Sequence, residues 1–271
     1  MNSGRFLSML AHVSVVASLA LGGCAPLTAR PFAARETTPA ADAEDDLPPV
    51  LTSADPMMFP HSWRAAPISA SGEALSAERL AHATAVLQSA MRKYPSRVLQ
   101  SHLKGVYALA ELRYSAIVAG GTNSRSHIYL KIGEVAQGFT DQNVEAIFHA
   151  EFSSILLRNR KDDFDAAAWL TLNPLEFEYL GNGVDAVKQH KVGLEMRDDL
   201  LEQGFLGLYG QSTMENDFNG FAARLFRGDP TLWDKAERFP KIRSKLDLTI
   251  RFYQKIDSTL SEAYFRSLRK Q

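Results

Sequence analysis

A carboxylate lies where a core residue is expected, in the segment that follows Thr140. Residues advance about 100° each around a helix, so Val144, Phe148 and Ile155 share one apolar stripe, and Glu151 falls inside it. A buried carboxylate must be hydrogen-bonded, paired with a cation, bound to a metal or kept protonated, because desolvating it unaided is costly. Glu151 is therefore a candidate functional group, although a structural ion pair gives the same signature.

A histidine precedes this acid but points to another side of the predicted helix. His149 stands two residues before Glu151, so it projects about 200° around the axis from it. The two side chains should therefore not meet at one metal ion. A hydrogen bond from His149 to a neighbouring segment is the favoured interpretation, and a role as a metal ligand is the weaker alternative.

A second acid follows a segment rich in glycine and aromatic residues that contains Tyr209. Ser212 and Glu215 have the spacing of a capping box, in which each side chain satisfies an amide of the first helical turn. This spacing predicts a helix that begins at Ser212. The capping box gives Glu215 a structural role at the start of this helix, and binding a metal ion is its alternative role.

The hydrophobic pattern predicts the elements that position these side chains. Apolar residues spaced by three and four indicate amphipathic helices, and β-rich runs indicate strands. The fold class is α+β, helix-dominated, with a small sheet and a long C-terminal helix. The expected strands are residues 106–112, 114–118 and 126–132, with 120–123 separating the last two; the expected helices are residues 76–94, 97–103, 140–158, part of 185–203, 212–226 and 241–268.

Three parts of the chain differ in composition. Residues 1–23 have the pattern of a secretory signal, with one basic side chain, an apolar run too short for a comfortable membrane span, and small residues at the end. Residues 24–72 are rich in proline and acidic residues and are expected to form a tether, whose later part, 55–63, has apolar residues suited to the domain surface. Residues 73–271 are expected to form one domain.

The bulk composition excludes several classes of protein. The 271 residues include 30 Lys plus Arg and 31 Asp plus Glu, a net charge of −1, so nucleic acid is not an expected partner. The chain has 1 cysteine, Cys24, which excludes an internal disulfide and thiolate-rich metal sites.

The sequence around this cysteine resembles the lipobox of bacterial lipoproteins. Leu21, Gly22 and Gly23 precede Cys24, and the resemblance implies that the signal is cut before Cys24 and that this residue carries acyl chains such as palmitate. Several acyl chains give near-permanent anchoring. Because Ala25 rather than Asp follows the cysteine, the resemblance also implies an outer-membrane location, on either its periplasmic side or the cell surface.

The domain resembles the zinc-binding metallopeptidase lipoproteins of bacteria, relatives of the gluzincins with an anthrax lethal factor-like domain. The resemblance rests on the strand 126–132, the helix segment 148–156, and Tyr209 followed by 215–218. It implies that Glu151 matches the general base of a His-Glu-x-x-His motif, Glu215 the third zinc ligand and Tyr209 the tyrosine that assists the oxyanion. The two positions that hold zinc-binding histidines in the family are Ala150 and Ser154 here, so the motif is degenerate.

Three functions follow from these patterns. The favoured one is a lipid-anchored, metallopeptidase-like protein without the two-histidine zinc site, which needs no cofactor and binds a peptide, glycan or protein partner. The first alternative is an active zinc peptidase with Glu151 as general base and atypical ligands drawn from Glu215, His149, His127 and His190. The second is a structural subunit of an outer-membrane assembly that makes its contacts through the C-terminal helix.

Overall fold

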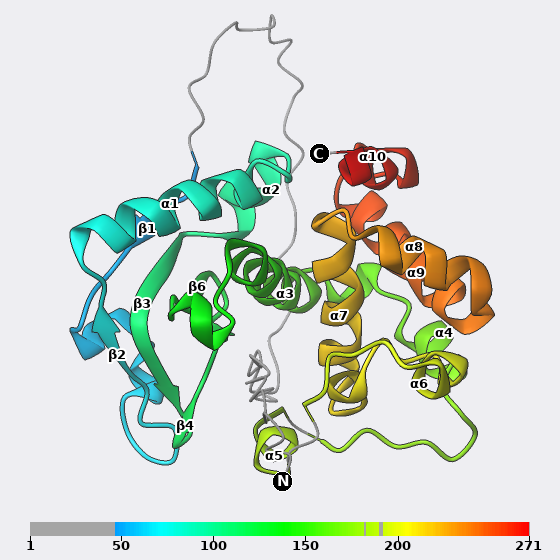
Figure 1. The fold of residues 1–271 in the computed structure, drawn as a ribbon, viewed down its shortest axis with the longest axis horizontal. Coiled ribbons are helices and arrows are strands. Elements are labelled where there is room, and N and C mark those ends of the chain that lie inside the picture. The colour runs from blue at the N-terminus through cyan, green and yellow to red at the C-terminus, as the bar shows by residue number, and fades with distance from the viewer. Residues whose placement is uncertain (1–46, 182, 190–191, 271) are drawn as a thin grey trace, which may run out of the picture.

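The helix that follows Thr140 is the centre of the molecule. The computed structural model describes residues 47–181, 183–189 and 192–270, and in it helix α3 covers Asp141–Asn159. Thr140 caps this helix by accepting a hydrogen bond from the amide of Asn143. Every residue from 147 to 157 is buried, because α3 lies between the sheet and the C-terminal helices (Figure 1). A side chain on any face of this stretch is therefore inside the protein.

The described residues form a small mixed sheet beside α3. The strands follow the order β1-β3-β6-β5, and β2 and β4 also pair with β3. Strand β3 is parallel to β1 and β6, and β5 runs antiparallel to β6 at one edge. The strands are β1 Val50–Leu51, β2 Ser71–Ala74, β3 Gly105–Tyr114, β4 Ile117–Val118, β5 Gly121–Asn123 and β6 His127–Lys131.

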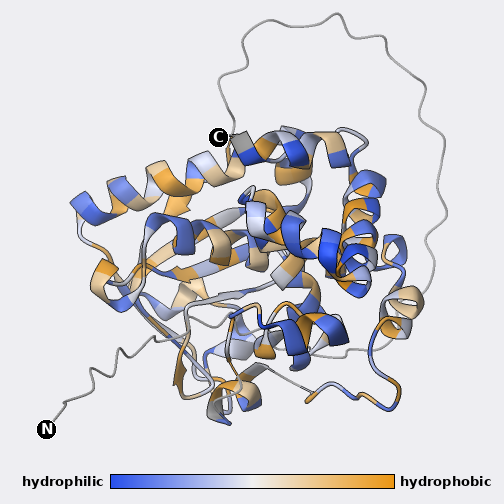
Figure 2. Ribbon diagram, turned by 45° about the vertical axis from the view of Figure 1, so that its right-hand side comes forward, coloured by the Kyte–Doolittle hydropathy of each residue, from blue (hydrophilic) through white to orange (hydrophobic). Residues whose placement is uncertain are grey.

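Helices cover one face of the sheet and continue into a second, helical part. Alternate residues of β3 and β6, such as Val106 and Ile128, share a core cluster with Leu87 of α1 and Phe148 of α3. Figure 2 shows hydrophilic and hydrophobic residues alternating along α1, as expected for a helix with one buried face. The α-helices are α1 Ala77–Met91, α2 Ser96–His102, α3, α4 Ala166–Thr171, α5 Gly183–Lys188, α6 Asp198–Gln203, α7 Met214–Phe226, α8 Pro230–Arg238, α9 Pro240–Ile256 and α10 Glu262–Ser267.

These elements confirm the predicted α+β, helix-dominated class with a small sheet. None of the helices among the described residues is long and apolar enough to cross a membrane. The predicted signal 1–23, the lipidation site Cys24 and the tether as far as residue 46 lie outside the described residues.

The second half of the expected tether packs on the domain, as its apolar residues 55–63 suggested, and strand β2 crosses the boundary predicted at residue 72. Strands β1 and β2 belong to the sheet, and two 3₁₀ turns, Pro56–Met58 and His61–Trp63, lie between them. Phe59 and Trp63 are buried and pack on the ring of Tyr129, which projects from the other face of the sheet. Proline content suggested a spacer here, but a few large aromatic side chains suffice to hold the segment on the sheet.

The expected long C-terminal helix is also wrong, because it is two helices. Helix α9 ends at Ile256, and α10 begins after Ser261. Between them, the side chain of Asp257 accepts hydrogen bonds from the amide and the hydroxyl of Thr259. This local turn interrupts the helix although the apolar spacing of three and four continues across it.

Three smaller expectations are corrected in the same way. The helix expected within 185–203 is two short helices, α5 and α6, and residues 121–123 of the expected separator form the edge strand β5. The cap of α7 is Thr213 rather than Ser212, since the Thr213 side chain accepts from the amide of Asn216. Glu215 is thus not the acid of a capping box and has another partner.

Candidate functional site

The fold places Glu151 against the edge of the sheet. Its side chain is completely buried on α3, and Nδ2 of Asn123, the last residue of β5, donates a hydrogen bond of 2.5 Å to Glu151 Oε2. A Cβ atom on Gly121 would lie 2.8 Å from Glu151 Oε1 and 2.6 Å from a methyl carbon of Ile147. The glycine therefore allows the carboxylate to approach the backbone of β5.

A guanidinium connects this acid to the second one. Arg158, two turns after Glu151 on α3, donates from Nη1 to Glu215 Oε1 at 3.0 Å. Its Nη2 donates to Oδ1 of Asn123 and to the carbonyl oxygen of Ser124. We call Asn123, Glu151, Arg158 and Glu215 the Arg158 network; it joins β5, α3 and α7 and places one positive charge among two acidic side chains.

Tyr209 lies beside the same two acids. It belongs to the 3₁₀ turn Leu208–Gln211 that precedes α7, and its side chain is buried. Burial raises the pKa of the Tyr209 hydroxyl well above its usual value, and the charges of Glu151 and Glu215 raise it further. The sequence-predicted candidates Glu151, Tyr209 and Glu215 thus come together, and the phenol stays protonated at neutral pH.

Helix α5 packs against Tyr209. A Cβ atom on Gly183 would lie 2.7 Å from the Tyr209 hydroxyl oxygen, so the start of α5 packs directly on the phenol. Ala186 of α5 is buried in the same apolar cluster as Tyr209 and Tyr129. Since Glu151 is 0% exposed and Tyr209 only 6%, the group is an interior one rather than the floor of an open cleft.

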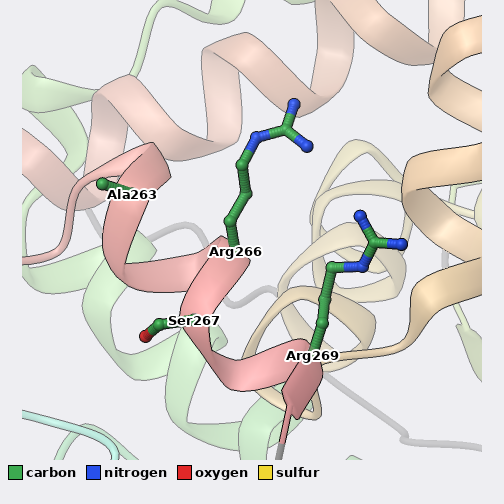
Figure 3. A pocket seen from close by; sticks show the side chains of 4 residues that line it. All are labelled: Ala263, Arg266, Ser267 and Arg269. Atoms are coloured by element: carbon green, nitrogen blue, oxygen red, sulfur yellow. The ribbon is translucent and has the colours of Figure 1, made fainter.

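Two surface hollows lie elsewhere on the described part of the protein. One, of 560 Å³, is lined by four residues near the C-terminus, and Figure 3 shows the two arginines among them, Arg266 and Arg269, projecting from the backbone in the same general direction. The other, of 440 Å³, lies between α1 and the start of α3. Neither hollow is lined by Glu151, Tyr209 or Glu215.

His149 belongs to a different network, on the far side of α3 from Glu151. Its Nδ1 lies 2.9 Å from the Tyr94 hydroxyl, and its Nε2 lies 3.2 Å from Oε1 of Glu145, which also pairs with Lys93 at 2.5 Å. A carboxylate only accepts, so Nε2 donates to Glu145 and Nδ1 accepts from Tyr94. Burial lowers the pKa of His149 to about 4, so the ring is neutral at neutral pH. Because His149 contacts Tyr94 and Glu145 whereas Glu215 contacts Arg158, these two predicted metal ligands do not meet at one site.

The residues present do not fit the zinc site that the family resemblance implies. Ser154, at one of the expected histidine positions, accepts a hydrogen bond from Asn219 of α7, and Ser153 donates to the same amide. Ala150, at the other, has no donor atom, and the carboxylate of Glu215 pairs with Arg158. Within the described ranges, no group of three or more His, Cys, Asp and Glu side chains is placed to hold a metal ion.

The two remaining histidines of the zinc alternative do not extend this site. The ring of His127 lies on β6, where its Nδ1 is 3.3 Å from the Ser126 hydroxyl and its ring is near that of Tyr107. Burial lowers the pKa of His127, and Lys104 lowers it further. His190 lies outside the described residues.

Sequence reasoning missed the two residues that connect the acids. Arg158 follows Glu151 by seven residues, a spacing that returns to the same helix face, so this partner had a detectable signal. Asn123 has no such signal, because its strand, β5, is only three residues long and the sequence predicts a separator between strands there. The sequence pattern also does not indicate that Asp217, two residues after Glu215, pairs with Lys245 of α9 at 2.6 Å.

Comparisons with known proteins give no relative for this chain: no protein-family model, no curated protein and no solved structure matches it.

Proposed function

We propose that the protein is an envelope lipoprotein, anchored to the outer membrane through Cys24, whose folded domain binds a peptide, glycan or protein partner without hydrolysing it. In this proposal the domain is metallopeptidase-like, and its zinc motif has been replaced by structural contacts. The resemblance at residues 148–156 and 209–218 supports the kinship. The contacts of Arg158 support the loss of the metal.

The single observation that carries the proposal is the pairing of the acids with a guanidinium. Arg158 donates to Glu215 directly and to Asn123, which in turn donates to Glu151. A fixed guanidinium supplies positive charge to the carboxylate of Glu215, and Glu151 is connected to it through the amide of Asn123, so a side chain takes the place that a metal would have. Hydrolysis through Glu151 needs an activated water beside the carboxylate, whereas Glu151 is completely buried, accepts a hydrogen bond from Asn123 and lies beside the buried Tyr209.

The direct test is the metal content and peptidase activity of the purified full-length chain. We expect zinc far below one equivalent per chain, and no cleavage of a peptide library with or without added Zn²⁺. One equivalent of zinc that is lost in Glu215→Gln, together with cleavage that is lost in Glu151→Gln, would instead establish the zinc-peptidase alternative. Arg160→Met, which changes a neighbouring arginine outside the network, is the matched control.

Anchoring is tested separately from the fate of the metal site. We expect Cys24→Ser to move the protein from the membrane fraction to the soluble fraction of the cell envelope, because stable anchoring depends on the acyl chains. Retention of the Cys24→Ser chain in the outer-membrane fraction, at the level of the unaltered chain, would contradict the lipid anchor and favour a structural subunit held by protein contacts.

A further inference from the structure

The loop of residues 173–180, between α4 and α5, presents an unusually exposed leucine. Leu175 is 95% exposed, the highest value among the large hydrophobic residues in the described part of the chain. It occupies a tight turn in which the amide of Phe177 donates to the carbonyl oxygen of Pro174 at 3.1 Å. Glu176, next in the turn, has φ +66°, a left-handed conformation that normally favours glycine or asparagine. The chain thus tolerates backbone strain and an exposed apolar side chain at one point.

The two ends of this loop are fixed by buried contacts. Asn173 Oδ1 accepts a hydrogen bond of 2.8 Å from Lys245, and the Tyr179 hydroxyl donates to Asp217 Oδ2 at 2.8 Å. Phe177 packs on Phe205, with 4.7 Å between the ring centroids. The loop follows the outside of the molecule (Figure 1), and its ends are held by these contacts while Leu175 is exposed. Strained residues on rigidly supported loops are typical of binding positions.

The charge of the loop indicates what it can contact. Glu176 and Glu178 are exposed on either side of Phe177, and residues 173–180 contain no lysine or arginine. Anionic lipid phosphates repel such a segment, which disfavours a membrane surface. A protein pocket with an apolar floor and a basic rim complements both the leucine and the two carboxylates.

We infer that the 173–180 loop is the surface by which this protein docks to another envelope protein, with Leu175 inserted into an apolar pocket rimmed by lysine or arginine. The inference rests on the proposed function, since it supplies the partner-binding surface that the buried Arg158 network does not offer. Two further leucines are exposed in this part of the chain, Leu170 on α4 and Leu180 at the end of the loop, 49% and 37% exposed.

Site-specific photo-cross-linking in cells that make the full-length, anchored chain tests this surface. The photoreactive residue p-benzoylphenylalanine replaces Leu175 or, as a matched control, Val135, which is 68% exposed on the 3₁₀ turn between β6 and α3. We expect one protein adduct from position 175 and none of that mass from position 135. The cross-linked partner peptide, identified by mass spectrometry, should carry apolar residues beside lysine or arginine. Adding Glu176→Lys and Glu178→Lys should lower the adduct yield at least about tenfold, because like charges then face each other.

Several results would overturn the inference. They are the absence of a position-175 adduct, an adduct only with lipid, the same adduct from position 135, and a yield unchanged by the two charge reversals. The melting temperature of each variant shows whether it is folded. Zinc content and peptidase activity do not depend on this loop, so a failure of the docking surface is distinguishable from a failure of the proposed function.

Discussion

Two acids on helix α7, separated by one residue, have different surroundings. Glu215 pairs at 3.0 Å with Arg158, whose side chain is 30% exposed and reaches the sheet edge through Asn123. Asp217 pairs at 2.6 Å with Lys245, and both of these side chains are buried. The first network joins β5, α3 and α7 and lies beside Tyr209, on which α5 packs, and the second lies among α4, α7 and α9.

The Asp217 pair is the more completely enclosed of the two. Asp217 Oδ2 also accepts from Trp169 and Tyr179, and Lys245 Nζ lies 4.3 Å from the centroid of the Phe205 ring. Burial raises the pKa of Asp217 and lowers the pKa of Lys245, while their attraction opposes both shifts. The comparison teaches that a buried or partly buried acid is not by itself a functional group, because Asp217 and Glu215 each have a cationic partner.

The largest effect is expected from breaking the enclosed pair. Lys245→Met leaves Asp217 buried without its counter-charge, which should lower the free energy of unfolding by about 3–5 kcal/mol. Urea denaturation measures the change, and Asp217→Asn in the same chain should restore part of it. A loss below about 1 kcal/mol would show that the pair is not the buried element described here.

Removing the guanidinium of the other network should have a smaller effect, because Arg158 is partly solvated. Arg158→Met is expected to lower the free energy of unfolding by about 2 kcal/mol through the loss of charged hydrogen bonds. Arg160→Met is the control: Arg160 is 38% exposed and pairs with Asp163 one turn away, so its loss should cost less than about 1 kcal/mol. If both substitutions lowered the free energy of unfolding equally, the Arg158 network would be no more stabilising than the surface pair of Arg160 and Asp163.

Alanine substitutions at two glycines, one against Glu151 and one in α7, test the close approach of Glu151 to the sheet. Gly121→Ala should cost about 1.5 kcal/mol, because the new methyl group meets Glu151 and Ile147. Gly220→Ala in α7 meets only a methyl carbon of Leu206 at 3.9 Å and should gain about 0.5–1 kcal/mol from helix propensity. Thermal denaturation of both variants checks the contrast, and a stabilising Gly121→Ala would mean that Glu151 does not lie against β5.

The smallest expected loss of stability comes from lowering the pH, through the buried His149 and its partners Tyr94 and Glu145 on the far side of α3. The folded-state pKa of His149, about 4, lies below its unfolded value, so the unfolded chain binds the proton first as pH falls. This contribution to stability is present above about pH 6.5 and is lost progressively towards pH 4, about 1 kcal/mol of it between pH 7.5 and 5.5. Glu145, with a pKa of about 2, titrates below this range. Urea midpoints at the two pH values should therefore differ less in His149→Gln than in the unaltered chain, and an identical difference would contradict the neutral ring.

The sequence predicts features that depend on neighbouring residues in the chain. The helix starts at Ser76 and Thr140 follow from caps that bond to amides three residues away, and the burial of Glu151 follows from its apolar stripe. The break at Asp257 was hidden because the apolar spacing continues through it. The two-residue strand β1 and the three-residue β5 are too short to show an alternating pattern, so their positions depend on pairing with β3 and β6.

The identity of each acid's partner could be predicted only in part. The spacing of seven residues places Arg158 on the face of Glu151, but its bond to Glu215 depends on how α7 packs against α3. The same holds for Lys245 and Asp217, which are 28 residues apart in sequence. Sequence patterns locate buried charges, whereas packing between elements decides whether a metal or a side chain neutralises them.

The most direct test of the central claim is a double-mutant cycle between Arg158 and Glu215. The free energy of unfolding is measured by urea denaturation for Arg158→Met, Glu215→Gln, both together and the unaltered chain. If the guanidinium is the counter-charge of this acid, the two substitutions should couple by about 1–2 kcal/mol. Coupling within about 0.3 kcal/mol of zero would show that Glu215 has another principal partner and would contradict the account.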